Sequence, residues 1–68
     1  METYYVNKQA QANGDHEVHT STCAWLPSEA NRRYLGQFSR CHGAVAEARK
    51  YYPKADGCRH CSTACHTR

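Results

Sequence analysis

The sequence contains few of the large apolar side chains from which protein cores are usually built. Its 68 residues include no isoleucine, two leucines, and one each of methionine, phenylalanine and tryptophan. A chain this short buries only about 60% of the surface that it exposes when unfolded. We therefore expect one domain over residues 1–68, with a core over about 3–62 and a short C-terminal tail over 63–68. Domains with so small a core usually add disulfides or a structural metal.

The chain also lacks the basic and apolar segments of a secretory signal, and it has no apolar run that could cross a membrane. Without export we expect it in the cytoplasm, whose reducing conditions disfavour structural disulfides. The five cysteines are an odd number, which complete pairing cannot use. Because clustered cysteines in that compartment more often bind metal, the sequence favours a metal over disulfides.

Strong charge and recognisable catalytic sets are absent as well. The formal net charge of +3 is typical of a soluble domain, and it permits contact with nucleic acid without requiring it. Arg32, Arg33 and Arg40, together with Tyr34, form a local basic cluster of the kind that is usually solvated surface. The chain has no paired acid/base carboxylates and no Ser/His/Asp set, so it is predicted not to be an enzyme. No small-molecule substrate is evident.

Three segments have the composition of strands. Thr3–Asn7 and His16–Thr20 are rich in aromatic and β-branched residues, and Asn13-Gly14-Asp15 between them is a strong turn signal. These segments predict a β-hairpin. Arg33–Phe38 alternates enough to be a third strand.

One helix is predicted to follow Ser39, which suits the N-cap position. Pro53 would end this helix near Tyr52. Small and apolar side chains recur at helical spacing on one face of it, namely Cys41, Ala44, Val45, Ala48 and Tyr52.

The segment between the hairpin and the third strand is less regular. Trp25 and Leu26 are expected to be buried, and Pro27 and Ser28 to open a short helical turn through Ala30. The predicted fold class is therefore α+β: a β-hairpin plus a third strand, one main α-helix and a C-terminal C-x2-C turn.

The two ends of this arrangement carry metal-ligand patterns. Zinc prefers four nitrogen or sulfur ligands in a tetrahedron, and two close pairs supply them readily. Cys58 and Cys61 form a C-x2-C turn, and Gly57 before them relieves crowding of the backbone. His19 and Cys23 can converge similarly if the chain turns between them. One Zn²⁺ on these four residues would tie the hairpin to the C-terminal segment, so the fold is predicted to be a small zinc-stabilised domain.

The order of short motifs also suggests a family. The chain reads YYVN, G-D-H-E-V-H-x3-C, N-x-x-Y-x3-F-S, an alanine-rich helix and G-C-x-x-C. In this order it resembles the Ada-type metal-binding domain, from about Tyr4 to Cys61. The resemblance implies a small hairpin-plus-helix fold with zinc on His19, Cys23, Cys58 and Cys61.

Two departures limit what the resemblance carries over. In the Ada repair protein two cysteine pairs bind the metal, and the first cysteine accepts a methyl group from a damaged DNA phosphate. The matching position here is His19, and an imidazole is not the thiolate nucleophile that this transfer needs. The segment YYPKAD before the C-x2-C turn is also longer, and a tail, STACHTR, follows it. We therefore expect the methyl transfer of that protein to be absent.

Four further side chains remain alternatives in or near the metal site: His16, Cys41, Cys65 and His66. Cys65 could take the place of His19, and His16 could serve as a ligand or as a hydrogen-bond partner of one. Cys41 falls on the apolar face of the helix, where a buried free cysteine acts as a small hydrophobe, and this core role is favoured over that of a ligand. His42 and His60 are expected to be exposed polar residues.

The predicted function is a small zinc-binding module. Its metal is structural, because four protein ligands leave no open position for water. We expect a monomer that presents a surface to a protein or a nucleic acid and has no membrane partner. The alternative is a thiolate alkyl acceptor, in which zinc-bound Cys23 or Cys58 takes up a methyl group.

Overall fold

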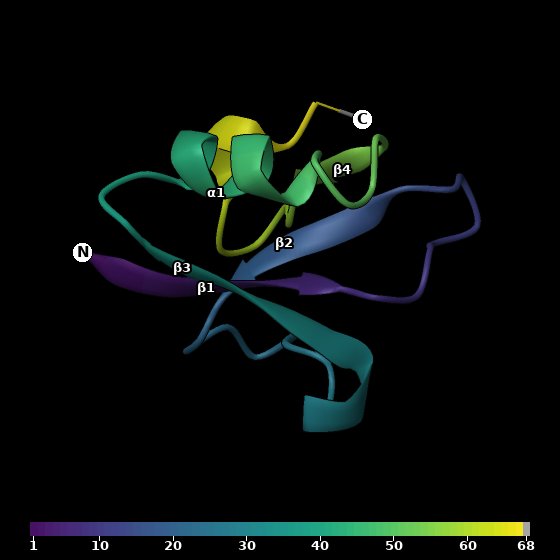
Figure 1. The fold of residues 1–68 in the computed structure, drawn as a ribbon, viewed down its shortest axis with the longest axis horizontal. Coiled ribbons are helices and arrows are strands. Elements are labelled where there is room, and N and C mark those ends of the chain that lie inside the picture. Colours follow the sequence, from purple (N-terminus) through teal and green to yellow (C-terminus); the bar gives the residue numbers. More distant parts are fainter. Residues whose placement is uncertain (68) are drawn as a thin grey trace.

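Within residues 1–67 the fold consists of a four-stranded sheet and one α-helix. Figure 1 shows the helix packed on one face of the sheet. The computed structural model describes residues 1–67. The strands are β1 (Glu2–Asn7), β2 (His16–Thr20), β3 (Arg32–Phe38) and β4 (Ala55–Gly57), in the sheet order β3-β1-β2-β4. The helix is α1 (Cys41–Ala48), and two short 3-10 turns are η1 (Glu29–Asn31) and η2 (Thr63–Cys65). The predicted α+β class is confirmed.

The predicted hairpin of β1 and β2 is confirmed. The two strands pair antiparallel, with Tyr5 opposite His19. In the turn between them Gly14 has a φ of +89°, a conformation that favours glycine. The backbone N–H of Asp15 donates to Oδ1 of Asn13 at 2.9 Å, which closes a local turn.

The third strand begins one residue earlier than predicted, at Arg32, and pairs antiparallel with β1. Its register shifts next to Tyr5, where a bulge places Leu35 in the core. Gly36 follows the bulge with a φ of +124°, which an L side chain rarely adopts.

Strand β4 was not predicted. It pairs parallel with β2, His16 lying opposite Ala55 and Val18 opposite Gly57. Three residues with an aspartate and a glycine among them have little strand propensity of their own. The strand conformation of β4 is therefore stabilised by its pairing with β2 rather than by local strand propensity.

Helix α1 begins at Cys41, so the predicted N-cap at Ser39 is wrong. Arg40 occupies the N-cap position with extended backbone, and its side chain makes no capping hydrogen bond. Regular helix ends at Ala48, and Tyr52 closes a last turn with its N–H 2.9 Å from the Ala48 carbonyl oxygen. No helix within residues 1–67 is long and apolar enough to cross a membrane.

The core lies between α1 and the sheet. It contains the predicted helix face together with alternate residues of the strands: Tyr4, Val6, Val18, Leu35, Cys41, Ala44, Val45, Ala48, Ala55 and Cys65. Trp25 is 64% exposed, so its predicted burial is wrong, and Leu26 is half-buried. The loop that carries Trp25 lies outside the space between α1 and the sheet, and a helical turn does form within it at Glu29–Asn31.

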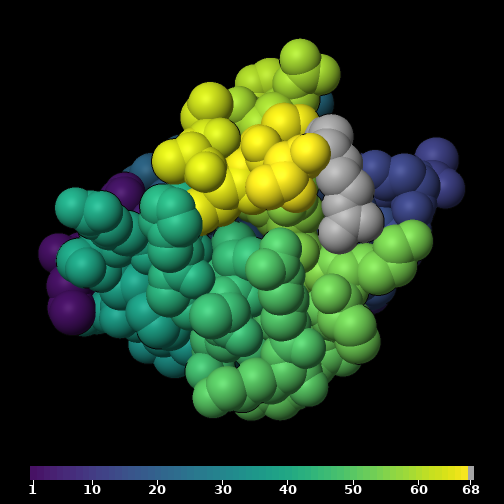
Figure 2. Space-filling view, turned by 90° about the horizontal axis from the view of Figure 1, so that it is seen from above, coloured from purple at the N-terminus to yellow at the C-terminus, as the bar shows by residue number. Residues whose placement is uncertain are grey.

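Cys41 and Cys65 form a disulfide between α1 and η2. The expectation that metal would replace disulfides is therefore wrong for this pair. Figure 2 shows the C-terminal segment lying against the helical part of the surface, and this contact is what brings the two sulfurs together. Both residues are buried, so the predicted burial of Cys41 is confirmed, but the prediction that it is a free cysteine is wrong. Cys65 belongs to the core rather than to a loose tail.

Candidate metal centre

The structure brings the four predicted ligands together at one end of β2 and β4. One ligand atom from each of His19, Cys23, Cys58 and Cys61 lies within 4.8 Å of the others. His19 is the fourth residue of β2, and Cys58 directly follows β4. The parallel pairing of these strands continues into a 3.0 Å hydrogen bond from the Cys58 N–H to the carbonyl oxygen of Val18. The unpredicted strand is thus what places the second ligand pair beside the first.

Short turns then complete each pair. The Cys23 N–H donates to the Thr20 carbonyl oxygen at 3.2 Å, so the chain reverses directly after β2. The Ser62 N–H donates to the Cys58 carbonyl oxygen at 2.9 Å and closes the C-x2-C turn. Both turns point their ligand atoms toward the same space.

The distances between ligand atoms suit a tetrahedral ion. Cys23 Sγ lies 3.9 Å from Cys58 Sγ, and Cys61 Sγ lies 4.0 Å from Nδ1 of His19. In a zinc site with bonds of the usual length, adjacent sulfurs are about 3.8 Å apart. These three thiols are free rather than bridged. The residues present therefore fit a metal ion such as zinc.

Each of the three sulfurs also accepts one backbone hydrogen bond. Trp25 N–H donates to Cys23 Sγ, His60 N–H to Cys58 Sγ, and Thr20 N–H to Cys61 Sγ, all at 3.4 Å. Such bonds stabilise the negative charge of a thiolate. The peptide backbone is therefore arranged to hold three thiolates, which is the ionisation state that a metal requires.

His19 is oriented by a residue that the sequence analysis missed. Its Nδ1 faces Cys61, and its Nε2 lies 3.5 Å from Oε1 of Glu17 with no closer partner in the described part of the chain. A carboxylate behind a ligating imidazole fixes its tautomer and raises its basicity. Glu17 stands two residues before His19 on a strand and so shares its face. This spacing was the signal in the sequence.

Burial affects the protonation of the four candidate ligands differently. Burial raises the pKa of Cys23 to about 12 and raises the pKa of Cys58 as well. Burial also opposes ionisation of Cys61, but hydrogen bonds from the Thr20 N–H and from neighbouring side chains lower its pKa overall. Burial lowers the pKa of His19, which favours the neutral imidazole that binds metal. Metal binding must therefore release protons, chiefly from Cys23 and Cys58.

The remaining candidates lie outside this cluster. His16 stacks on Tyr52 and places Nδ1 2.9 Å from the Asn7 carbonyl oxygen. Cys65 is held in the disulfide, and Nδ1 of His66 lies 3.1 Å from the Gly57 carbonyl oxygen. None of these three joins the four clustered ligands.

His42 and His60 are exposed, as predicted. His60 lies on the C-x2-C turn and stacks on Trp25 with ring centroids 5.1 Å apart. Gly57 is needed for space rather than for an unusual backbone angle. A Cβ atom there would lie 2.7 Å from both Cys65 Cβ and the Ser62 carbonyl oxygen.

No protein-family description, curated protein or solved structure matches this chain. Its own geometry therefore carries the assignment: it is a small α+β domain whose buried cluster of one histidine and three cysteines can bind a metal ion.

Proposed function

We propose that the protein is a small zinc-binding module in which one Zn²⁺ is held by His19, Cys23, Cys58 and Cys61 and is structural. The observation that carries this proposal is the matched set of three N–H bonds, one to each sulfur of a cluster with tetrahedral spacing. Four protein ligands give zinc a closed shell, and closed shells are typical of structural rather than catalytic sites. When bound, the metal supplies a cross-link between β2 and the segment after β4.

The test is a zinc titration of the chain with its disulfide intact, in competition with a chromogenic chelator. We expect one Zn²⁺ per monomer, and native mass spectrometry reports both numbers. His19→Gln should weaken binding by about 100-fold or more, because even partners outside the ligand shell are worth 10–100-fold. His16→Gln is the matched control. It changes another histidine of β2 that lies outside the cluster, and its affinity should remain that of the wild type.

A wild-type chain that binds no zinc, or a His19→Gln variant that binds as tightly as His16→Gln, would refute the proposal. The Ada-like character of the domain belongs to the same proposal. It is supported by the clustering of the four matching positions, with His19 in place of one cysteine, and by the arrangement of a hairpin and a helix around them.

The proposed binding surface is the one that the metal cluster orders. Trp25 and His60 stack on each other at the surface, and the backbone N–H of each donates to a cluster sulfur. These two hydrogen bonds to the candidate site therefore fix the positions of both residues. An exposed, rigid aromatic pair beside a mildly basic chain suits base stacking with single-stranded nucleic acid, and it suits a protein partner equally.

The lone tryptophan makes this surface easy to follow. Zinc should change its fluorescence, and an oligonucleotide that binds should change it again with an affinity that falls steeply as salt is added. Binding that ignores salt, or no binding of oligonucleotides at all, would leave a protein as the partner.

The alkyl-acceptor alternative rests on Cys23, the half-buried thiol that follows β2. Its sulfur already accepts the Trp25 N–H, and such a bond reduces the nucleophilicity of a thiolate. Incubation of the zinc-loaded domain with a methylating agent separates the two proposals. The structural proposal expects no mass increase on Cys23 or Cys58.

A further inference from the structure

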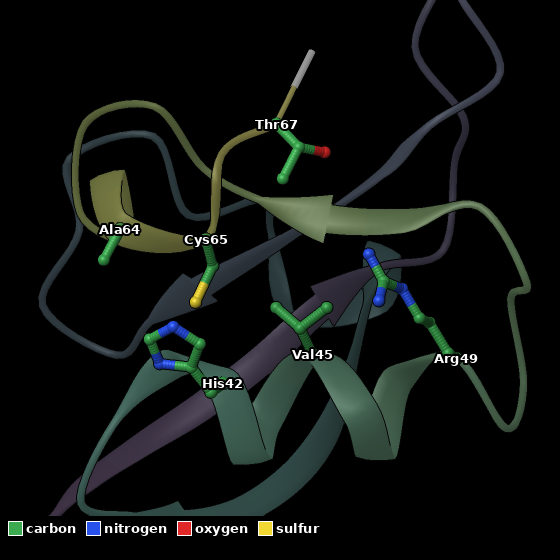
Figure 3. A pocket seen from close by; sticks show the side chains of 6 residues that line it. All are labelled: His42, Val45, Arg49, Ala64, Cys65 and Thr67. Atoms are coloured by element: carbon green, nitrogen blue, oxygen red, sulfur yellow. The ribbon is translucent and has the colours of Figure 1, made fainter.

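Helix α1 and turn η2 bring together a second group of soft donor atoms, separate from the candidate metal centre. Cys41, His42 and Cys65 each place one ligand atom within 4.8 Å of the others. The two sulfurs are joined in the disulfide, whereas His42 is exposed and its side chain has no hydrogen-bond partner among residues 1–67. In Figure 3 the imidazole of His42 lies beside the sulfur of Cys65.

A cavity of about 320 Å³ borders this group and is partly open to solvent. The residues that line it are His42, Val45, Arg49, Ala64, Cys65 and Thr67. In Figure 3 the cavity lies between the helix and the C-terminal segment, with the Cys65 sulfur at its edge. A small reductant can therefore approach the disulfide from this side, although both cysteines are largely covered.

The helix start also lies beside one of the two sulfurs. Cys41 is the first residue of α1, where the free N–H groups of the helix can stabilise a metal-bound thiolate. Arg49 lines the same cavity, but its guanidinium is engaged elsewhere: Nε donates to the Ala55 carbonyl oxygen at 3.1 Å, and Nη2 lies 4.0 Å from Oδ1 of Asp56. Metal binding at this site must therefore displace the protons of both thiols.

We propose that reduction of the Cys41–Cys65 disulfide creates a second site for a thiophilic ion such as Zn²⁺, with Cys41, Cys65 and His42 as ligands. Two molecules of a low-molecular-weight thiol supply the two electrons, become a disulfide themselves and leave two protein thiols. Zn²⁺ then takes both sulfurs and a neutral imidazole nitrogen, and the two thiol protons pass to water. The chain thus exchanges a covalent cross-link for a coordinated one at the same place.

The backbone permits this exchange without rearrangement. The Cα atoms of Cys41 and Cys65 are 6.2 Å apart, so both side chains can still reach a common ion after the bond is broken. The sulfurs need only separate to about 3.8 Å, the usual spacing of two thiolates on one zinc. The fourth position would face the cavity, where water has room. Unlike the first cluster, this site would be open.

The experiment compares zinc stoichiometry before and after reduction by a trialkylphosphine under anaerobic conditions. The phosphine takes an oxygen atom from water as it reduces the disulfide, so the atoms balance without added thiol. We expect one Zn²⁺ per chain in the oxidised protein and two in the reduced protein, read by native mass spectrometry and chelator competition. His42→Gln should weaken only the second site, by about 100-fold or more. His16→Gln, which removes a histidine of β2 that lies outside both groups, should leave both sites unchanged.

The same zinc count in the oxidised and reduced wild-type protein would overturn the proposal, and so would equal second-site affinity in His42→Gln and His16→Gln. A double variant, Cys41→Ser with Cys65→Ser, controls for effects of phosphine that do not involve this disulfide, because it lacks the disulfide in every condition. It should bind one zinc whether or not phosphine is present. This inference does not depend on the first site. If the oxidised protein bound no zinc, the structural proposal would fail, while a single zinc that appears on reduction and requires His42 would still support the second site.

Discussion

At the scale of single residues, the clustering of the four candidate ligands could be predicted from the sequence, whereas the position of Glu17 behind His19 could not. Cys58 and Cys61 are two residues apart on a tight turn, and this spacing alone indicates convergence. The spacing of His19 and Cys23 indicates a metal site only in combination with that second pair. Glu17 went unrecognised because a carboxylate next to a histidine has many roles, and only the strand geometry shows that it lies behind the imidazole.

Glu17→Gln tests that role. Loss of the carboxylate charge behind Nε2 should reduce the basicity of the His19 imidazole and weaken zinc binding by about 10–100-fold. Chelator competition measures the change. Glu29→Gln, at an exposed glutamate of η1, is the matched control and should bind as the wild type does. Equal affinities in the two variants would contradict the assigned role of Glu17.

Acidification should release the metal. Burial lowers the pKa of His19 from its usual 6.5, so the folded state favours the neutral imidazole, while the unfolded chain takes up a proton first as the pH falls. The contribution of His19 to stability is therefore present above pH 6.5 and is lost progressively below it. The protons displaced from the high-pKa thiols of Cys23 and Cys58 act in the same direction. Zinc affinity measured between about pH 8 and pH 5.5 should fall steadily, and a flat profile would show that protons do not compete for this site.

At the scale of elements, the strands with strong local signals were predicted and the one without was not. The aromatic and β-branched residues of β1 and β2 and the turn at Gly14 act over a few neighbouring residues, which a sequence pattern captures. Strand β4 exists because β2 offers it a partner far away in the chain. The start of α1 was placed one residue early, because Ser39 has a good capping side chain that the structure does not use.

Gly57→Ala tests how tightly β4 and the following turns are packed. The added methyl group would lie 2.7 Å from Cys65 Cβ and from the Ser62 carbonyl oxygen, and one of these obstacles is backbone. We expect a loss of about 1–3 kcal/mol in the free energy of unfolding, measured by denaturant titration, together with weaker zinc binding. Ala64→Ser, at an exposed position of the same segment, should change neither. If Gly57→Ala were as stable as the wild type, the segment after β4 would be able to shift and accommodate the added methyl group.

At the scale of the whole molecule, a disulfide and a candidate metal centre accompany a small core. The sequence predicted the metal link and rejected a disulfide, because the cysteine count and the expected compartment gave no reason for one pair to form. Only the contact of α1 with η2 shows that Cys41 and Cys65 meet. The candidate metal joins β2 to the C-terminal segment, and the disulfide joins that segment to the helix, so the two links share one strip of chain.

Removing the links separately and together should show how they combine. A disulfide that spans 24 residues is worth about 3 kcal/mol. With this disulfide intact, we expect a strong chelator to lower the melting temperature of the domain while leaving some folded protein at 25 °C. Chelator and phosphine together should unfold it, which far-ultraviolet circular dichroism would report. An ordered domain after both treatments would mean that the apolar core is sufficient by itself.

The parallel pairing of β2 with β4 has a consequence for how the domain assembles. The residues that meet in the candidate metal cluster are separated by 35 and 42 positions for the pairs Cys23–Cys58 and Cys61–His19. Contacts between such distant parts of a chain form late, since closing the intervening loop costs conformational entropy before any contact repays it. Early in refolding each ligand pair can offer an ion only two donors. The rate at which refolding protein removes zinc from a weak indicator dye would therefore report the last step of sheet formation.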